Sequence, residues 1–243
     1  MKKYCLFDMN TLSESDFSVI NSNVKIVNQL NNKLIEKTIC LNVDFDLPIK
    51  NIKCWIDDYY KIFRRIKINI PDEKASFCKG EKIIYKLEYL GLNMVQSFES
   101  IIDFYNDRKT LMSILNIIEN AKNNNLYIDP HPKNFTLLNG KVGFVDFTPP
   151  YGIKDYRDAR IKIEKSNRNI ISKNLDVFHP NNLFYHFIGD MFNISDDYRT
   201  ILKLYQFMYD NSFVNLPLDD GIKKAKSIRA IEDDRLSRNL FLM

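Results

Sequence analysis

The first part of the chain carries apolar residues mainly in the alternating pattern typical of strands. Alternation over residues 24–30 and 37–43 predicts a β-hairpin, with its turn at the Asn-Asn-Lys sequence of residues 31–33. Asparagine suits that position because it tolerates left-handed backbone geometry. The same pattern predicts two more strands, over residues 2–7 and over residues 82–89 after a Lys-Gly turn.

Helical spacing of apolar residues occurs once within this strand-rich part, over residues 52–66, and dominates the chain after Gly91. The later helices are predicted over residues 94–105, 109–121, 183–192, 196–211 and 219–240. Strands with one helix, followed by a run of helices, indicate an α+β protein built from a strand-rich and a helical part.

A second hairpin is predicted in the sequence FTLLNGKVGFVDF. Asn139-Gly140 is a preferred dipeptide for a type I′ turn, and alternating apolar residues flank it. The hairpin would return Asp146, at the end of its second strand, to the side of Asn134 and Asp129, which precede its first strand. Three oxygen-bearing side chains at one end of a rigid hairpin suit Mg²⁺, which prefers one or two carboxylates together with substrate phosphates.

Each of these three residues also has an ordinary structural interpretation. Asp129 would cap a turn, Asn134 would cap the end of a strand, and Asp146 would lie in solvent. Their shared spacing around one hairpin favours the metal-binding interpretation over three separate coincidences.

The sequence DPHPKN at residues 129–134, the hairpin, and the sequence DF at residues 146–147 resemble the catalytic and metal-binding segment of the protein-kinase-like superfamily. The resemblance is greatest to the branch that acts on small molecules, which includes aminoglycoside phosphotransferases, choline kinases and fructosamine kinases. Asn134 follows Asp129 by five positions, as a kinase catalytic loop requires. The motif support extends over residues 80–150, and the sequence EYLG before residue 92 resembles the hinge of that family.

The resemblance implies a two-lobed kinase-like α+β fold. Its small N-terminal lobe, residues 1–90, would hold an antiparallel sheet with one helix, and its larger, mainly helical lobe would comprise residues 91–243. The nucleotide would lie as Mg²⁺-bound ATP in the cleft between the lobes, where Glu88 and Leu90 of the hinge would contact it. The implied activity is transfer of the γ-phosphate of ATP to a hydroxyl of a small molecule.

The resemblance also implies residue roles. Asp129 would orient or deprotonate the acceptor hydroxyl, while Asn134 and Asp146 would hold Mg²⁺ on the nucleotide phosphates. His131 is expected to be a structural residue of the loop rather than a catalyst. Phosphoryl transfer needs mainly positioning and charge neutralisation, so few side chains are required.

The phosphate-binding lysine of the small lobe is assigned to Lys37, with Lys25 and Lys50 as alternatives. Its acidic partner on the predicted helix would be Asp57 or Asp58, where the family more often has glutamate. A solvent-exposed position is an equally good interpretation for each of these side chains.

The chain also departs from the family pattern. It has no glycine before Gly80 and therefore lacks a glycine-rich phosphate loop. Tyr127 and Ile128 precede Asp129, where the family often has His-Gly or His-Arg, and a Thr-Pro-Pro sequence follows residue 147. These departures support an alternative function, a catalytically inactive kinase-like binding or scaffold module.

Composition and charge exclude several other classes of function. A net charge of +4 is mild and spread along the chain, which argues against nucleic-acid binding and leaves an RNA-associated role as a minor hypothesis. The densest basic cluster is expected on the solvent side of a helix and comprises Lys61, Arg64, Arg65 and Lys67. Four widely spaced cysteines form no zinc motif, and no apolar run reaches the roughly 18 residues of a membrane span. We therefore expect a cytoplasmic protein without a membrane partner.

The acceptor and the oligomeric state are not indicated by the sequence. Aspartates of the last part of the chain would form an acidic pocket for a cationic acceptor or, as the more frequent arrangement, lie on solvated faces: Asp155, Asp158, Asp190, Asp196 and Asp197. Resemblance in fold alone does not identify the substrate.

Overall fold

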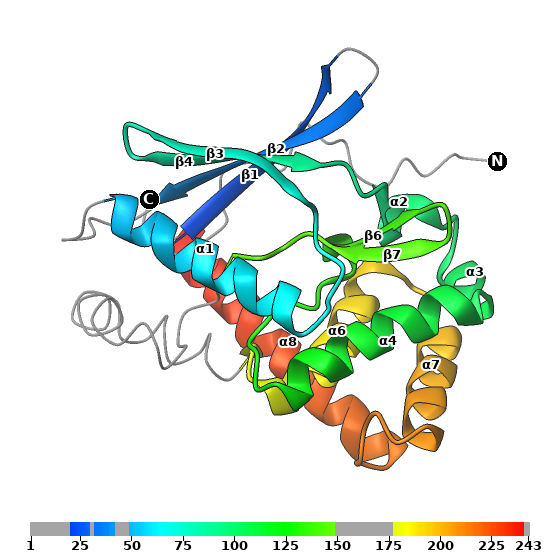
Figure 1. Cartoon of the computed structure of the whole chain (residues 1–243). Helices are drawn as coiled ribbons and strands as arrows, with labels where there is room; N and C mark the ends of the chain where they lie inside the picture. The colour runs from blue at the N-terminus through cyan, green and yellow to red at the C-terminus, as the bar shows by residue number, and fades with distance from the viewer. Residues whose placement is uncertain (1–19, 30–31, 42–48, 149–176, 241–243) are drawn as a thin grey trace.

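The structure is a computed structural model and describes residues 20–29, 32–41, 49–148 and 177–240. These residues form an α+β protein with small antiparallel sheets and several helices (Figure 1). The predicted strand over residues 2–7 lies outside the described residues.

Four antiparallel strands in the order β1-β2-β4-β3 form the first sheet. They are β1 (Ile20–Gln29), β2 (Asn32–Leu41), β3 (Glu73–Lys79) and β4 (Lys82–Glu88). The predicted pairing of β1 with β2 is confirmed, but the turn predicted at residues 31–33 is misplaced, because Asn32 and Lys33 already pair with Gln29 and Asn28. A strand ladder is held by backbone hydrogen bonds, so it continues through polar positions that the alternation pattern assigns to a turn.

The sequence did not predict β3. It is an edge strand whose side chains are mostly exposed, including Phe77 at 41%. A strand with no buried face has no hydrophobic alternation to detect.

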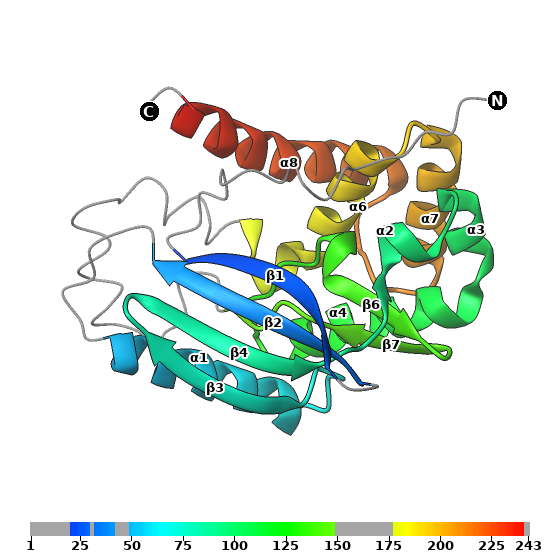
Figure 2. The ribbon, with the colours of Figure 1, turned by 90° about the horizontal axis from the view of Figure 1, so that it is seen from above.

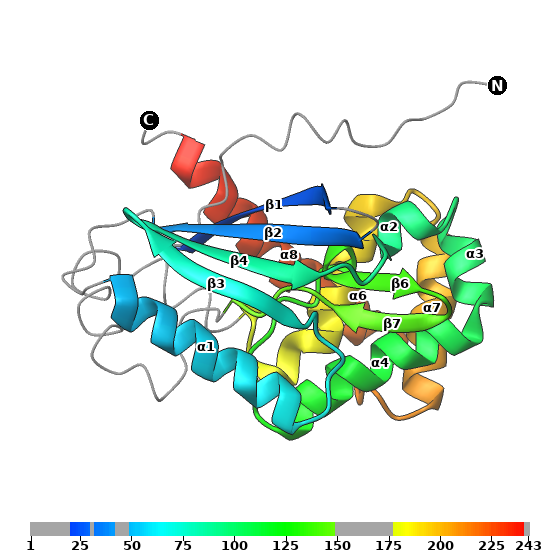
Figure 3. The same ribbon diagram turned by 45° about the horizontal axis from the view of Figure 1, so that its top comes forward.

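Helix α1 (Ile49–Arg65) covers one face of this sheet (Figures 1 and 3). Its buried residues Ile52, Ile56, Tyr59 and Phe63 recur every three or four positions and form one stripe. Burial of each such side chain contributes about 1.5–3 kcal/mol, so packing on the sheet stabilises a helix that would be marginal alone. The basic cluster Lys61, Arg64, Arg65 and Lys67 is exposed, as predicted.

A three-stranded sheet in the order β5-β6-β7 follows, formed by β5 (Leu92–Asn93), β6 (Phe135–Leu138) and β7 (Lys141–Phe144). The hairpin predicted in the sequence is confirmed: Phe135 pairs with Phe144, and the two turn residues Asn139 and Gly140 have φ angles of 51° and 72°. Two consecutive positive φ angles are the requirement of a type I′ turn.

The remaining described elements are helical. They are α2 (Met94–Ser97), α3 (Ile101–Asn106), α4 (Arg108–Asn123), the 3₁₀ helix η1 (Pro132–Asn134), the 3₁₀ helix η3 (Pro180–Asn182), α6 (Leu183–Ile194), α7 (Tyr198–Asp210) and α8 (Leu218–Leu240). The single helix predicted over residues 94–105 is wrong, because the segment forms the two helices α2 and α3. The Ser100 side chain accepts a hydrogen bond from the Asp103 N–H, and this N-cap starts a new helix.

Helix α6 is the centre of the helical part. Its residues from Leu183 to Met191 are all buried, and α4, α7 and α8 pack against it (Figure 2). The contact with α8 is close at Gly189, where a Cβ atom would lie 2.8 Å from the carbonyl oxygen of Ala225. Among the described helices, none is both long enough and apolar enough to cross a membrane.

Candidate functional site

Lys37 lies at an inward-facing position of β2. Its neighbours at the same face, Ile35 and Ile39, are buried in the core, and Lys37 itself is only 3% exposed. A lysine at such a position needs a partner, because an unpaired buried charge is costly. Its Nζ donates to Oδ1 of Asp146 over 2.7 Å, although the two residues are 109 positions apart. Two residues that the sequence assigned to the nucleotide site are therefore in direct contact.

The Asp146 carboxylate is held as an anion that remains in contact with solvent. It is 23% exposed and also accepts hydrogen bonds from the Thr148 hydroxyl over 2.7 Å and from the Thr148 N–H over 3.4 Å. Burial alone would raise its pKa, but the Lys37 ammonium and the hydrogen bonds outweigh that effect and hold the pKa below its ordinary value. Asp146 is consequently ionised at neutral pH.

The neighbouring Phe147 anchors this carboxylate. Its ring is fully buried and meets the rings of Tyr60, from α1, and Tyr85, from β4, edge-to-face at centroid distances of 5.3 and 5.4 Å. The Lys37 ammonium also lies 4.7 Å from the centre of the Phe147 ring. Position 147 thus joins the strand-rich part of the chain to the segment that follows β7.

The loop from Asp129 to Asn134 is fixed by its own polar groups. Oδ1 of Asp129 accepts from the His131 N–H over 3.0 Å, and the Asn134 side-chain nitrogen donates to the Asp129 carbonyl over 3.0 Å. His131 caps η1, because its Nδ1 accepts from the Lys133 N–H over 3.1 Å. This is a structural role of the kind predicted for His131.

The hairpin then brings Asn134 close to the chain segment of Asp146. The Asn134 carbonyl accepts from the Val145 N–H over 2.9 Å, one position before Asp146. Since the side-chain nitrogen of Asn134 is used on the Asp129 backbone, its side-chain oxygen is the atom that it can offer to a cation.

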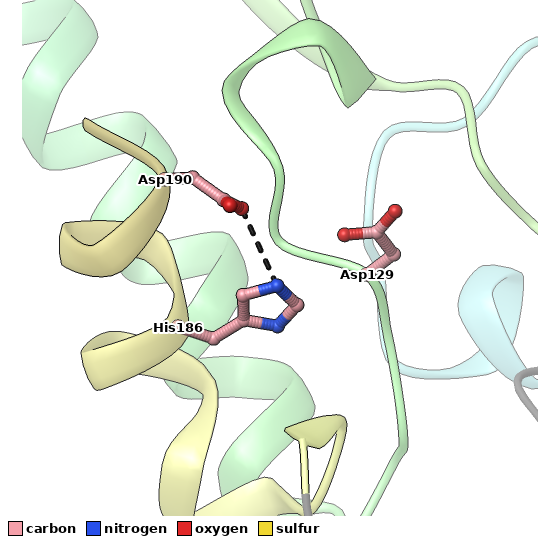
Figure 4. Close-up of side chains that lie close together, drawn as sticks. All are labelled: Asp129, His186 and Asp190. Carbon is pink, nitrogen blue, oxygen red and sulfur yellow. Dashed lines mark ion pairs between the residues drawn. The ribbon is translucent and has the colours of Figure 1, made fainter. Parts of the chain in front are cut away.

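The Asp129 carboxylate lies close to two buried polar residues of α6, His186 and Asp190 (Figure 4). One candidate ligand atom from each of the three side chains lies within 4.8 Å of the other two. His186 and Asp190 are one helical turn apart, with Nε2 of His186 3.4 Å from Oδ2 of Asp190, and both are fully buried. Arg229 of α8 donates to Oδ1 of Asp190 over 2.8 Å. The expectation that Asp190 lies on a solvated face is wrong, because Arg229 and His186 compensate its burial.

His186 was not found by the sequence reasoning. The only signal for it is the spacing of His186 and Asp190 at i and i+4 inside an otherwise apolar helix, YHFIGD. Two polar residues on one face of a buried helix indicate a buried polar contact, but the sequence does not indicate with which segment.

The predicted hinge residues Glu88 and Leu90 lie where the chain passes from the first sheet to the second. Glu88 ends β4, and its N–H donates to the carbonyl of Asp72 over 2.9 Å. Leu90 packs on β7 so closely that a Cβ atom at Gly143 would lie 2.7 Å from its Cδ1. Gly91 has a φ of 101°, and a Cβ atom there would overlap the Leu137 carbonyl. The linking segment therefore lies directly on the hairpin that carries the site.

Among the other candidates for the phosphate-binding lysine, Lys50 is exposed in the first turn of α1, and the side chain of Lys25 lies outside the described part of the structure. Asp57 accepts hydrogen bonds from the Tyr85 hydroxyl over 2.8 Å and from Lys53 over 2.7 Å. Burial and this bond raise the pKa of the Tyr85 phenol, which keeps it a donor.

The aspartates proposed as an acidic pocket do not share one environment. Asp190 is buried, whereas Asp197 caps α7 and accepts from Thr200. The hydrogen bonds from the Thr200 hydroxyl and N–H lower the pKa of Asp197. Asp155 and Asp158 lie outside the described residues.

A scan against models of protein families and a search of curated proteins both find no match. The interpretation of the site therefore depends on its own geometry together with the motif resemblance.

Proposed function

We propose that the chain is an ATP-dependent phosphotransferase that moves the γ-phosphate of ATP to a hydroxyl of a small molecule. The observation that carries this proposal is the bond between the buried Lys37 ammonium and the Asp146 carboxylate. It joins Lys37, the first of the three lysines considered for the nucleotide phosphates, to Asp146, the carboxylate that the motif resemblance assigns to Mg²⁺ on those phosphates, across 109 positions of sequence. No local feature of either segment requires these two groups to meet.

The proposal includes a two-lobed kinase-like arrangement with the nucleotide between the lobes. The four-stranded sheet with α1 would be the small lobe, and the β6–β7 hairpin with the helices would be the large one. Three features support this division: Lys37 comes from the first part, Asp146 from the second, and the segment of Glu88 and Leu90 connects them.

The residues at the end of the hairpin fit a Mg²⁺ ion on a nucleotide. Asp146 is an ionised carboxylate with solvent access, and Asn134 offers an amide oxygen from the adjacent strand end. The ion would neutralise charge on the phosphates. Lys37 would share its ammonium between Asp146 and a phosphate oxygen. Asp129 would orient the acceptor hydroxyl and accept its proton at a carboxylate oxygen.

A second candidate function is an inactive kinase-like module that binds a ligand or a protein without transferring phosphate. Two observations favour it. Of the two acidic residues of α1 considered as partners of the lysine, Asp57 bonds to Tyr85 and Lys53, and Asp58 is exposed and pairs with Lys61. The chain also has no glycine before Gly80, so the first hairpin lacks the glycines that let a backbone approach phosphates closely.

The first experiment measures thermal stabilisation by ATP with and without Mg²⁺, in the wild type and in Asp146→Asn. ATP at about one hundred times its dissociation constant should stabilise the wild type by about 2.7 kcal/mol. The stabilisation should require Mg²⁺ and be absent in Asp146→Asn. The control is Asp58→Asn, which removes an exposed carboxylate paired with Lys61 and should retain the shift.

The second experiment separates the two candidate functions. Asp129→Asn should keep Mg²⁺-dependent ATP binding and lose phosphate transfer to a panel of hydroxylated acceptors. Binding in the wild type without transfer or ATP hydrolysis would instead favour the inactive module. A wild type that gives no shift with ATP or GTP would contradict the nucleotide site itself.

A further inference from the structure

The carboxylate of Asp129 is bordered on the α6 side by a chain of three polar side chains. Arg229 holds Asp190 over 2.8 Å, and Asp190 in turn faces Nε2 of His186 over 3.4 Å. His186 and Asp129 complete the chain within the 4.8 Å cluster (Figure 4). The groups come from α8, α6 and the loop before η1, so the contact joins three separate parts of the fold.

Because these side chains are buried, their contacts restrict how the His186 ring can be oriented. His186 and Asp190 are fully buried, and the Phe178 ring packs against the His186 imidazole at 5.2 Å. Arg229 is 16% exposed and carries a charge that compensates Asp190. In such surroundings an imidazole has few orientations, because each rotation would remove a polar contact that water cannot replace.

Asp129, His186 and Asp190 would also suit a transition metal, since histidine and carboxylates bind Zn²⁺. The geometry favours positioning instead. One oxygen of Asp190 is engaged by Arg229, and Oδ1 of Asp129 is engaged by the His131 N–H. A cation would also lie close to the Arg229 guanidinium, which opposes its binding.

We propose that His186 is a positioning residue for Asp129. Its imidazole fixes the orientation of the Asp129 carboxylate towards the acceptor, and the Asp190–Arg229 pair fixes the imidazole. The Asp129 loop is also held by the Asn134 side chain and by the His131 N–H. The proposal rests on the proposed function, because it assigns His186 to the group that would accept the proton of the acceptor hydroxyl.

The test compares His186→Asn and His186→Gln with the wild type in phosphate transfer, or in ATP hydrolysis where no acceptor is found. The amide of glutamine reaches the position of Nε2, whereas the amide of asparagine does not. We expect His186→Asn to lower kcat about 10- to 100-fold with an unchanged KM for ATP, a range typical of lost positioning. His186→Gln should recover a large part of kcat. A merely structural role would reduce the amount of folded protein without changing kcat per ATP-binding site.

The matched control is His179→Asn. His179 caps η3 just before α6, and asparagine caps helices equally well, so kcat should not change. An equal loss of kcat in His179→Asn, or equal losses in His186→Asn and His186→Gln, would overturn the positioning role.

A second measurement does not need turnover. In urea unfolding of Asp129→Asn, His186→Asn and the double variant, the two substitutions should be coupled. The changes in the unfolding equilibrium constant of the two single variants are multiplied together and compared with the change in the double variant. The two values should differ by about threefold or more, the size expected for closely neighbouring residues. Independent effects of the two substitutions would contradict the positioning of Asp129 by His186. Stoichiometric metal in the purified wild type, lost in His186→Asn, would show a metal site and overturn positioning. A wild type without turnover would refute the proposed function and the catalytic role, while the coupling would still report whether His186 and Asp129 interact.

Discussion

Replacement of Lys37 by methionine is the sharpest test of the ion pair that joins the two ends of the candidate site. Methionine keeps most of the apolar stem between Ile35 and Ile39 and removes only the charge. Breaking a fully buried pair by removing one partner typically costs 3–5 kcal/mol. Because the Asp146 carboxylate is 23% exposed and keeps its bonds to Thr148, water relieves part of that penalty. We therefore expect Lys37→Met to lower the free energy of unfolding at pH 7 by about 2 kcal/mol.

The pH dependence of this penalty has a defined sign. The pKa of Asp146 in the folded protein is below its ordinary value of 3.8, so the pair contributes its full stability above that pH. The contribution is lost as the pH falls through the folded pKa. The difference between wild type and Lys37→Met should therefore be constant from pH 7 to pH 5 and shrink below about pH 4.

Urea unfolding monitored by circular dichroism at several pH values measures this difference. Asp146→Asn should cost more than Lys37→Met, because it leaves the ammonium of a side chain that is only 3% exposed without its partner. The control Lys61→Met removes a lysine from an exposed pair with Asp58 and should have no measurable effect. Equal stability of wild type and Lys37→Met at pH 7, or a penalty that grows in acid, would refute the reasoning.

Two further predictions concern the stability of the segment at Gly91 and of the start of α4. Gly91→Ala should lower the free energy of unfolding in urea by about 2–5 kcal/mol, because a Cβ atom combines an unfavourable φ with overlap on the Leu137 carbonyl. Gly80→Ala has a positive φ but open space around it, so a loss as large as that of Gly91→Ala would contradict this explanation. Asp107→Ala should cost about 1 kcal/mol of unfolding free energy, because the Asp107 side chain caps α4 by accepting from the Thr110 N–H over 3.1 Å. An unchanged urea midpoint would show that the cap does not contribute.

The parts of the fold that the sequence predicted best are those determined by short-range pattern. The β6–β7 hairpin follows from Asn139-Gly140 and its flanking alternation, and α4 is predicted to within a few residues by its apolar stripe. The edge strand β3 and the break before Ser100 were missed for opposite reasons. The first has no buried face, and the second has an apolar pattern that continues through a cap.

For the end of the candidate site that would hold the nucleotide, the sequence indicated the residues but not their contacts. Spacing and resemblance selected Asp129, Asn134 and Asp146. Lys37 was only one of three lysines considered for the phosphates. The bond of Lys37 to Asp146 depends on how two distant segments pack, which no local period encodes. His186 was missed altogether, because its polar surroundings are created by the loop of Asp129 and by the Asp190–Arg229 pair between α6 and α8.

The attachment of the first sheet to the segment after β7 has a consequence for synthesis on the ribosome. Asn69 accepts from the Phe144 N–H and donates to the Val142 carbonyl, while Phe147 completes the packing between Tyr60 and Tyr85. The strand-rich part, although first to be made, thus lacks part of its own core until residue 147 has left the exit tunnel. The strand-rich part is therefore expected to fold only after residue 147 has emerged, and not as soon as its own residues are made. A nascent chain stalled before that point should remain sensitive to protease along β4 and α1.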